Sequence, residues 1–400
     1  MINRSFTLGI LAALGSLTAL LPAQAQNRTP PDSQLAGTPD TVLLARIDGK
    51  RIVLDGHELD LRIQYMLQED RAEEARRAAT QHAKAPSDPF ATPAGSAAIR
   101  QSANQRWIER SEPAPRMAWV RNLSAPGRGG KIAVRVYHPK AKGKLPILVY
   151  YHGGGWLFGN LDASDSSNRM IADEARVIVV SVDYRLAPEW PYPAAWNDAE
   201  DSYDWVARNA AALGGDASRI CIGGDSAGGN MAIAVTRRRL AAGKAPPACQ
   251  LLYYAAVDNR SVADMRHDYA SARLFGKGFN LDSEFTTYVL AKVFPGRDLS
   301  APEISPLFAP EVRRMPPTLL AASGFDPLRD SDRAYAARLD QAGVPVTYCE
   351  FPTLIHGFLQ HTAVTHAADR AVRETAGLFG KLARGARLDA KGAPDCGGAP

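Results

Sequence analysis

Residues 219–240 read RICIGGDSAGGNMAIAVTRRRL, and their order predicts a short strand, a tight turn and a helix. The turn has the pattern Gly-x-Ser-x-Gly, from Gly224 to Gly228, with one more glycine on each side. A serine at such a strand-to-helix corner needs neighbours without bulk, because the backbone passes close to both elements. Its hydroxyl then lies at the helix N-terminus, where unpaired N–H groups favour a developing negative charge. The stretch therefore predicts Ser226 as a nucleophile.

Strand and helix patterns alternate on both sides of this corner. Apolar runs predict strands at residues 145–151, 177–182, 220–222, 250–256, 318–322 and 346–350, after a hairpin of residues 117–122 and 131–137 that turns at 125–127. Helical patterns occupy residues 164–175, 195–212 and 330–342. Apolar strands that alternate with helices indicate a mostly parallel sheet covered on both faces. The fold class is therefore α/β and doubly wound.

A nucleophilic serine needs a base to accept its proton and a third group to orient that base. His356, in the sequence Leu-Ile-His-Gly-Phe, follows the last predicted strand and fits the base. Asp326 follows the preceding strand and fits the orienting acid, with Asp330 as the alternative acid. The predicted catalytic residues are thus Ser226, Asp326 and His356.

A run of three glycines, His152-Gly153-Gly154-Gly155-Trp156, follows the apolar strand at 145–151. Consecutive glycines allow backbone N–H groups to turn toward one point, where the oxyanion of a tetrahedral intermediate would lie. The aromatic residues beside the motifs are candidate walls of a substrate pocket, with plain core packing as the alternative: Trp156, Phe158 and Phe358.

In these motifs the sequence resembles the hormone-sensitive-lipase-like family of α/β-hydrolase esterases, from about residue 117 to residue 380. The segment 183–189, Asp-Tyr-Arg-Leu-Ala-Pro-Glu, belongs to the resemblance and is expected to be structural. The resemblance implies a mostly parallel eight-stranded sheet flanked by helices, with a helical cap. It assigns the oxyanion N–H groups to Gly154, Gly155 and Ala227. It also implies hydrolysis of short- to medium-chain carboxylic esters through an acyl-enzyme, without a cofactor or metal.

The ends of the chain differ from its body. Residues 1–25 have Arg4, an apolar run and a small-x-small site that ends at Ala25, which predicts a cleaved signal peptide and export to the periplasm or medium. An uncleaved membrane anchor is the alternative. The predicted domains are a flexible leader at 26–41, a helical cap and linker at 42–115, a catalytic domain at 116–388 with a cap insertion at about 260–300, and a disordered tail at 389–400. Leu59, Ile63 and Met66 predict a helix in the cap, and residues 85–100 are rich in proline, alanine and serine, as linkers are.

Charge and cysteine content argue against a nucleic-acid-binding protein and against a cysteine metal site. The mature chain would carry a net charge of only about +4, and no nucleic-acid-binding motif accompanies the basic run at 237–239, which is expected to be a solvated face. Cys221, Cys249 and Cys349 lie in apolar runs and are expected to be buried free thiols, although an exported chain can also form disulfides. Cys396 lies in the tail, and none of the four has metal-ligand spacing.

The expected partner is a small-molecule ester, without nucleic acid or stable membrane insertion, and a homodimer is left open. The same residues would serve an amidase or formamidase, or a deacylase of carbohydrate or phenolic esters. A ligand-binding homologue with a broken triad is disfavoured because all three triad positions are occupied. Activity that depends on an imidazole base is expected to fall as the pH drops through about 6.5.

Overall fold

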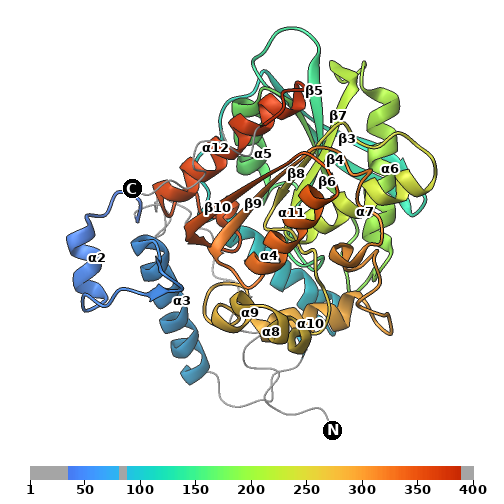
Figure 1. Cartoon of the computed structure of the whole chain (residues 1–400). Coiled ribbons are helices and arrows are strands. Elements are labelled where there is room, and N and C mark those ends of the chain that lie inside the picture. The colour runs from blue at the N-terminus through green and yellow to red at the C-terminus, as the bar shows by residue number, and fades with distance from the viewer. Residues whose placement is uncertain (1–34, 81–87, 389–400) are drawn as a thin grey trace.

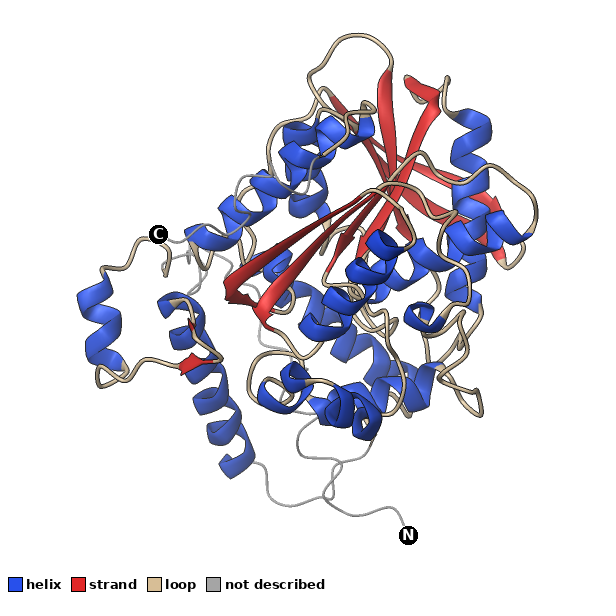
Figure 2. Cartoon of the chain, viewed as in Figure 1, coloured by secondary structure: helices blue, strands red, loops and turns tan. Residues whose placement is uncertain are grey.

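The computed structural model describes residues 35–80 and 88–388 and contains one large twisted sheet with helices on both faces (Figures 1 and 2). The eight strands have the order β10-β9-β8-β7-β5-β6-β4-β3. Only the pairs β3–β4 and β4–β6 are antiparallel. The strands are β3 (Trp119–Gly127), β4 (Gly130–His138), β5 (Leu145–Tyr151), β6 (Ile178–Asp183), β7 (Gly215–Asp225), β8 (Gln250–Tyr253), β9 (Thr318–Phe325) and β10 (Val346–Ile355). The predicted eight-stranded, mostly parallel sheet is confirmed.

The sheet separates two hydrophobic cores, and β5 contributes to both because all seven of its residues are buried. Ile147, Val149 and Tyr151 lie in the core beneath α6 (Ala194–Asn209), α7 (Ala227–Ala241) and α11 (Arg329–Gln341). Leu148 and Tyr150 lie in the opposite core, beneath α5 (Asp165–Ala175) and α12 (His366–Ala383). A parallel strand with both faces covered is apolar throughout, and this is why the sequence pattern identified β5.

The opening hairpin turns later than the sequence predicts. Ala125 pairs with Ile132 and Pro126 with Lys131, so β3 continues through the predicted turn and the chain reverses after Gly127. Because β3 is the edge strand of the sheet, Pro126 can lack an N–H group without losing a bond inside the sheet.

The N-terminal part contains more helix than predicted. It consists of α2 (Asp40–Arg46), the two-residue strands β1 (Val53–Leu54) and β2 (His57–Glu58), α3 (Leu61–Thr80) and α4 (Pro93–Glu109). The predicted cap helix is α3, but residues 93–100, predicted as linker, form the first half of α4. The Thr92 side chain accepts the Gly95 N–H at the start of α4, and Pro93 occupies the first turn. These two residues are a standard helix start, and Ile99 and Ala103 then bury one side of the helix.

The predicted cap insertion contains α8 (Val262–Asp268), α9 (Ala270–Leu274) and α10 (Ser283–Val293), and short 3-10 helices follow at η3 (Pro306–Phe308) and η4 (Phe358–Gln360). In the part of the chain that the structure describes, no helix is long and apolar enough to cross a bilayer. The predicted signal peptide, most of the leader and the tail lie outside the described residues.

The expectation of buried free thiols is wrong. Cys221 on β7 and Cys249, just before β8, form a disulfide with their Cα atoms 4.6 Å apart. These two strands are parallel neighbours, with Ile222 opposite Gln250, so the preceding residues also lie side by side. Cys349 is disulfide-bonded as well. The linear spacing of the cysteines does not reveal which strands become neighbours, so the sequence left this pairing open.

The basic run in α7 is not the solvated face that the sequence predicts. Arg239 is buried, donates to the Ala245 carbonyl and forms an ion pair with Asp204. Arg238 donates to the Asn197 side chain. The run therefore holds α7 against its neighbours.

Adding a methyl group to Gly228 is expected to destabilise the fold strongly. A Cβ atom at this position would lie 1.9 Å from the Tyr151 carbonyl oxygen, which belongs to the central strand and cannot move freely. We expect Gly228→Ala to lower the free energy of unfolding by about 3 kcal/mol, measured by urea denaturation. Gly377→Ala is the matched control, because a Cβ there meets nothing within 4 Å and the site is in helix α12. That control should stabilise by about 0.5–1 kcal/mol; similar losses in both variants would contradict the steric account.

Candidate active site

Ser226 lies at the corner between β7 and α7 with φ 53° and ψ −117°, in the region that side chains rarely adopt. Its backbone N–H donates to the Tyr253 carbonyl at 2.9 Å. A Cβ atom on Gly224 would lie 2.4 Å from the Gly228 carbonyl carbon. The corner therefore requires the small neighbours that the sequence predicts, and it exposes the serine hydroxyl above the sheet.

The three predicted triad residues come together from the ends of β7, β9 and β10. The Ser226 Oγ lies 3.0 Å from His356 Nε2, and His356 Nδ1 lies 2.7 Å from Asp326 Oδ2. Asp326 is fully buried, and its other oxygen accepts the Leu328 N–H at 2.8 Å. This arrangement favours the tautomer with hydrogen on Nδ1, which leaves Nε2 free to accept the serine proton. Asp330, the alternative acid, instead accepts the Ser271 N–H and pairs with Arg329.

The glycine loop after β5 lies beside the nucleophile. Gly154 and Gly155 have φ of +100° and +58°, and both line the same pocket as Ser226 and Ala227. Within residues 35–80 and 88–388, neither glycine N–H has a hydrogen-bond partner. Ala227 is the first residue of α7, at the positive end of the helix dipole. The loop thus leaves N–H donors unused next to the serine, as an oxyanion site requires.

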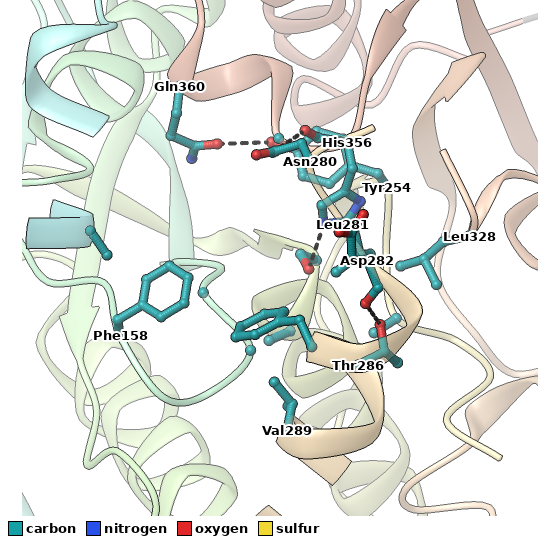
Figure 3. A pocket seen from close by; sticks show the side chains of 18 of the residues that line it. Phe158, Tyr254, Asn280, Leu281, Asp282, Thr286, Val289, Leu328, His356 and Gln360 are labelled. Atoms are coloured by element: carbon teal, nitrogen blue, oxygen red, sulfur yellow. Dashed lines mark hydrogen bonds between the residues drawn. The ribbon is translucent and has the colours of Figure 1, made fainter. Parts of the chain in front are cut away.

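A pocket extends from the serine, and Figure 3 shows Phe158 and Val289 on its walls. Of the three predicted aromatic wall residues, Trp156 and Phe158 line it. Phe358 does not: its fully buried ring packs on Tyr254 and Phe351, with ring centroids 5.1 and 5.3 Å away. Gly357, with φ +81°, turns the chain so that Phe358 enters the core beneath the sheet. The prediction for Phe358 as a pocket wall is therefore wrong.

Sequence reasoning missed most of the remaining pocket residues. They are Tyr254 and Asn280 in loops, Phe285, Val289 and Leu290 on α10, and a charged group from the N-terminal helices, namely Asp70, Arg71, Glu74, Arg106 and Arg110. The start signal at Thr92 and Pro93 would have revealed α4, but no local pattern shows that its side chains face this pocket.

A family model described as the α/β-hydrolase fold matches residues 148–360. A carboxylic ester hydrolase of Mycobacterium tuberculosis, LipN, is 36% identical over 320 residues, which cover 78% of this chain and 80% of that protein. The chain is an esterase of the hormone-sensitive-lipase-like α/β-hydrolase family. The esterase is also 34% identical over 261 residues to an ethyl acetate hydrolase of Pseudomonas putida, covering 63% of the chain and 80% of that protein.

The esterase resembles solved structures as well. A crystal structure of an α/β-hydrolase enzyme from the metagenome of Lake Arreo matches with a TM-score of 0.72 and 34% identity. The match covers 80% of the esterase and 98% of that chain. The predictions of the fold, the family and a serine ester hydrolase are therefore confirmed.

Asp225, the residue before the nucleophile, ties the glycine loop to the sheet. Its Oδ1 accepts the Gly153 N–H at 3.0 Å and the Tyr150 hydroxyl at 2.9 Å, and Gln360 donates to its other oxygen. Burial raises the pKa of Asp225 to about 6. This side chain therefore positions the glycine loop in the esterase. Among the described residues, no three His, Cys, Asp or Glu side chains are grouped so as to hold a metal ion.

Two buried histidines are expected to make the esterase less stable in acid. Burial lowers the pKa of His152 to about 4 and that of His361 to about 3. Below pH 6.5 the unfolded chain binds protons that these rings in the folded chain do not, so stability falls as the pH drops from 6.5 toward those values. We expect the free energy of unfolding, measured by urea denaturation, to fall between pH 7 and pH 4.5 in the wild type. In His361→Gln this fall should be about 2 kcal/mol smaller. His267→Gln, whose side chain is 88% exposed, is the control and should behave like the wild type; equal losses in all three proteins would contradict the prediction.

Proposed function

We propose that the esterase hydrolyses short- to medium-chain carboxylic esters by transferring the acyl group to Ser226. The observation that carries this proposal is the continuous contact from Asp326 through His356 to the Ser226 hydroxyl, at 2.7 and 3.0 Å. Beside it lie Gly154 and Gly155, whose N–H groups have no hydrogen-bond partner in the described part of the chain. Together these groups supply a nucleophile, a base and a site for negative charge, which are the parts that acyl transfer needs.

In the first half of the reaction, the Ser226 oxygen attacks the ester carbonyl while His356 Nε2 takes its proton. The carbonyl oxygen becomes negative and is stabilised by the N–H groups of Gly154, Gly155 and Ala227. His356 then gives its proton to the leaving alcohol, and the acyl group remains on Ser226. In the second half, water attacks the acyl-enzyme by the same steps and releases the acid. The Asp326 carboxylate stabilises the imidazolium that forms each time.

The test of this function is covalent labelling with an alkyl fluorophosphonate. The serine oxygen displaces fluoride, and mass spectrometry should find the adduct on the peptide that contains Ser226. Full labelling together with hydrolysis of p-nitrophenyl butyrate would support the proposal. An unlabelled, folded protein would favour the ligand-binding alternative, and faster turnover of butyryl p-nitroanilide than of the ester would favour the amidase.

We expect butyrate esters to be hydrolysed at least about tenfold more efficiently than palmitate esters. Val289 lines the pocket beside the glycine loop, since a Cβ on Gly155 would lie 3.2 Å from its Cγ2. The buried ring of Trp156 stacks on that of Trp196, with the ring centroids 5.2 Å apart, and so limits the space on this side. The ethyl acetate hydrolase among the relatives is named for a substrate with a short acyl group. A series of p-nitrophenyl esters from acetate to palmitate measures this preference, and the highest kcat/KM on palmitate would contradict it.

Export of the esterase, with cleavage after Ala25, is a further part of the proposal. It rests on Arg4, the apolar run and the small-x-small site in the sequence. The Cys221–Cys249 disulfide supports it, because disulfides persist mainly in oxidising compartments. N-terminal sequencing of protein from the periplasm or the medium should begin at Gln26. Protein that begins at Met1 and stays in the cytoplasm would contradict export.

A further inference from the structure

The two ends of the pocket differ in chemistry. One end is apolar and is formed by Trp156, Phe285, Val289 and Leu290. The other end lies beside the catalytic histidine, where Figure 3 shows Asn280 and Gln360 near His356 and far from Val289. Helices α3 and α4 add the charged side chains of Asp70, Arg71, Glu74 and Arg106 to the pocket lining, and Arg110, directly after α4, adds a fifth.

Three of these charged side chains, Asp70, Arg106 and Arg110, lie close to His361, and Glu74 lies close to Asp70, Arg71 and Arg106. The His361 ring interacts electrostatically with Arg110, Asp70 and Arg106, and all four residues line the pocket. His361 itself follows His356 after the short helix η4. We call the group formed by His361, Asn280, Asp282 and these five charged residues the polar end of the pocket.

Three members of the polar end have hydrogen-bonding capacity that the protein does not use. Within residues 35–80 and 88–388, the Glu74 carboxyl makes no hydrogen bond or ion pair. Arg71 forms no ion pair there either, and its guanidinium uses only Nε, which donates to the Leu67 carbonyl. His361 pairs through Nδ1 with the Gly357 carbonyl, and because its ring is neutral, Nε2 is left as an acceptor.

The balance of charge argues for a neutral ligand. An anion at the polar end would face the carboxyl groups of Asp70, Glu74 and Asp282, and a cation would face three arginines. Asp70 and Arg110 form an ion pair with each other, so their charges largely offset each other at the site of a ligand. The unused groups are of both kinds, donor and acceptor, and a hydroxyl group can satisfy either kind.

The polar end also lies on the side from which the alcohol leaves. The leaving oxygen must receive its proton from His356 Nε2, so the alcohol lies next to this ring. Asn280 Nδ2 donates to the His356 carbonyl at 2.9 Å, and Gly357 and His361 continue the same wall. Trp107, next to Arg106 on α4, also lines the pocket, with its ring 5.4 Å from that of Phe158. It offers an apolar surface against which the C–H face of a ring can pack.

We propose that the natural substrate is an ester of a neutral polyhydroxylated alcohol, a sugar or a polyol, whose hydroxyl groups bond to Glu74, Arg71 and His361. This inference rests on the proposed function, because it concerns the alcohol half of the same ester. Water is added across the ester bond, the acid is released from Ser226, and the sugar or polyol leaves with the proton that His356 supplies.

The test compares two acetates that differ only in polarity at the ring. Methyl 6-O-acetylglucoside carries ring hydroxyls, and cyclohexylmethyl acetate has a ring of similar size without them. We expect the glucoside to have a kcat/KM at least about tenfold higher, because a site built to bond hydroxyls discriminates against a substrate that lacks them. Glu74→Leu and Arg71→Leu should each lower this ratio by about tenfold. Glu74→Gln keeps the shape of the side chain and one acceptor oxygen, and should recover part of the ratio.

Glu69→Gln is the matched control, since Glu69 lies on α3 outside the pocket lining and should leave the ratio unchanged. Thermal unfolding of each variant checks that it is folded. A wild type that prefers the cyclohexyl ester would overturn this inference, and so would a ratio that the Leu variants do not change, while the proposed esterase function would remain. Failure to hydrolyse either acetate or the butyrate ester would overturn the proposed function itself.

Discussion

Alanine in place of Ser226 is expected to lower kcat on p-nitrophenyl butyrate by about 10⁶-fold, the loss typical of removing a triad serine. The hydroxyl that contacts His356 Nε2 at 3.0 Å is the atom that would carry the acyl group, and no covalent intermediate forms without it. The remaining rate would come from binding and from the N–H groups of the glycine loop. Steady-state kinetics with enzyme at high concentration measures the loss.

Ser164→Ala provides the control for this variant. Ser164 is buried, and its hydroxyl has no hydrogen-bond partner within the described residues, but it lies outside the pocket lining. The control should retain kcat within about twofold. If Ser226→Ala kept more than a tenth of the wild-type rate while folded, Ser226 would not be the nucleophile.

The sequence predicts the strands best where the chain is buried on both faces. The run at 145–151 corresponds to β5 residue for residue, because a covered parallel strand is apolar along its whole length. The strand before the nucleophile is longer than predicted, since β7 begins at Gly215 and its first residues include Asp216 and Arg219, which pair with each other. Polar residues at the start of a strand conceal it from a search for apolar runs.

The loops that carry the triad and the glycine run are predictable because each depends on local chemistry. Gly228 must be small and Ser226 must follow a strand, and both requirements are visible in the sequence. The walls of the pocket are different, because they depend on how distant segments pack. Arg71 reaches the pocket from α3, and Tyr254 from a turn with φ 33° after β8. The periodicity of a sequence does not indicate which distant side chains will line a pocket. The incorrect prediction of Phe358 as a pocket wall has the same cause.

Asparagine in place of Asp326 is expected to lower kcat by about 10⁴-fold while leaving the fold intact. The carboxylate accepts a hydrogen bond from the Nδ1–H group of His356, with 2.7 Å between the nitrogen and the oxygen, and so favours the tautomer whose Nε2 carries no hydrogen. An amide can donate to Nδ1 instead, which places the hydrogen on Nε2 and removes the base. Kinetics on p-nitrophenyl butyrate, with thermal unfolding to confirm the fold, measures the effect.

Asp330→Asn separates the two candidate acids, because Asp330 lies on the same loop-to-helix segment but faces Ser271 and Arg329. It makes no contact with the His356 ring, so this variant should keep kcat within about tenfold of the wild type. We expect the variant to have a lower free energy of unfolding instead, because it weakens the hydrogen bond that the Ser271 N–H donates to Asp330. If Asp330→Asn lost as much activity as Asp326→Asn, the histidine would depend on both carboxylates, and the orienting role could not be assigned to Asp326 alone.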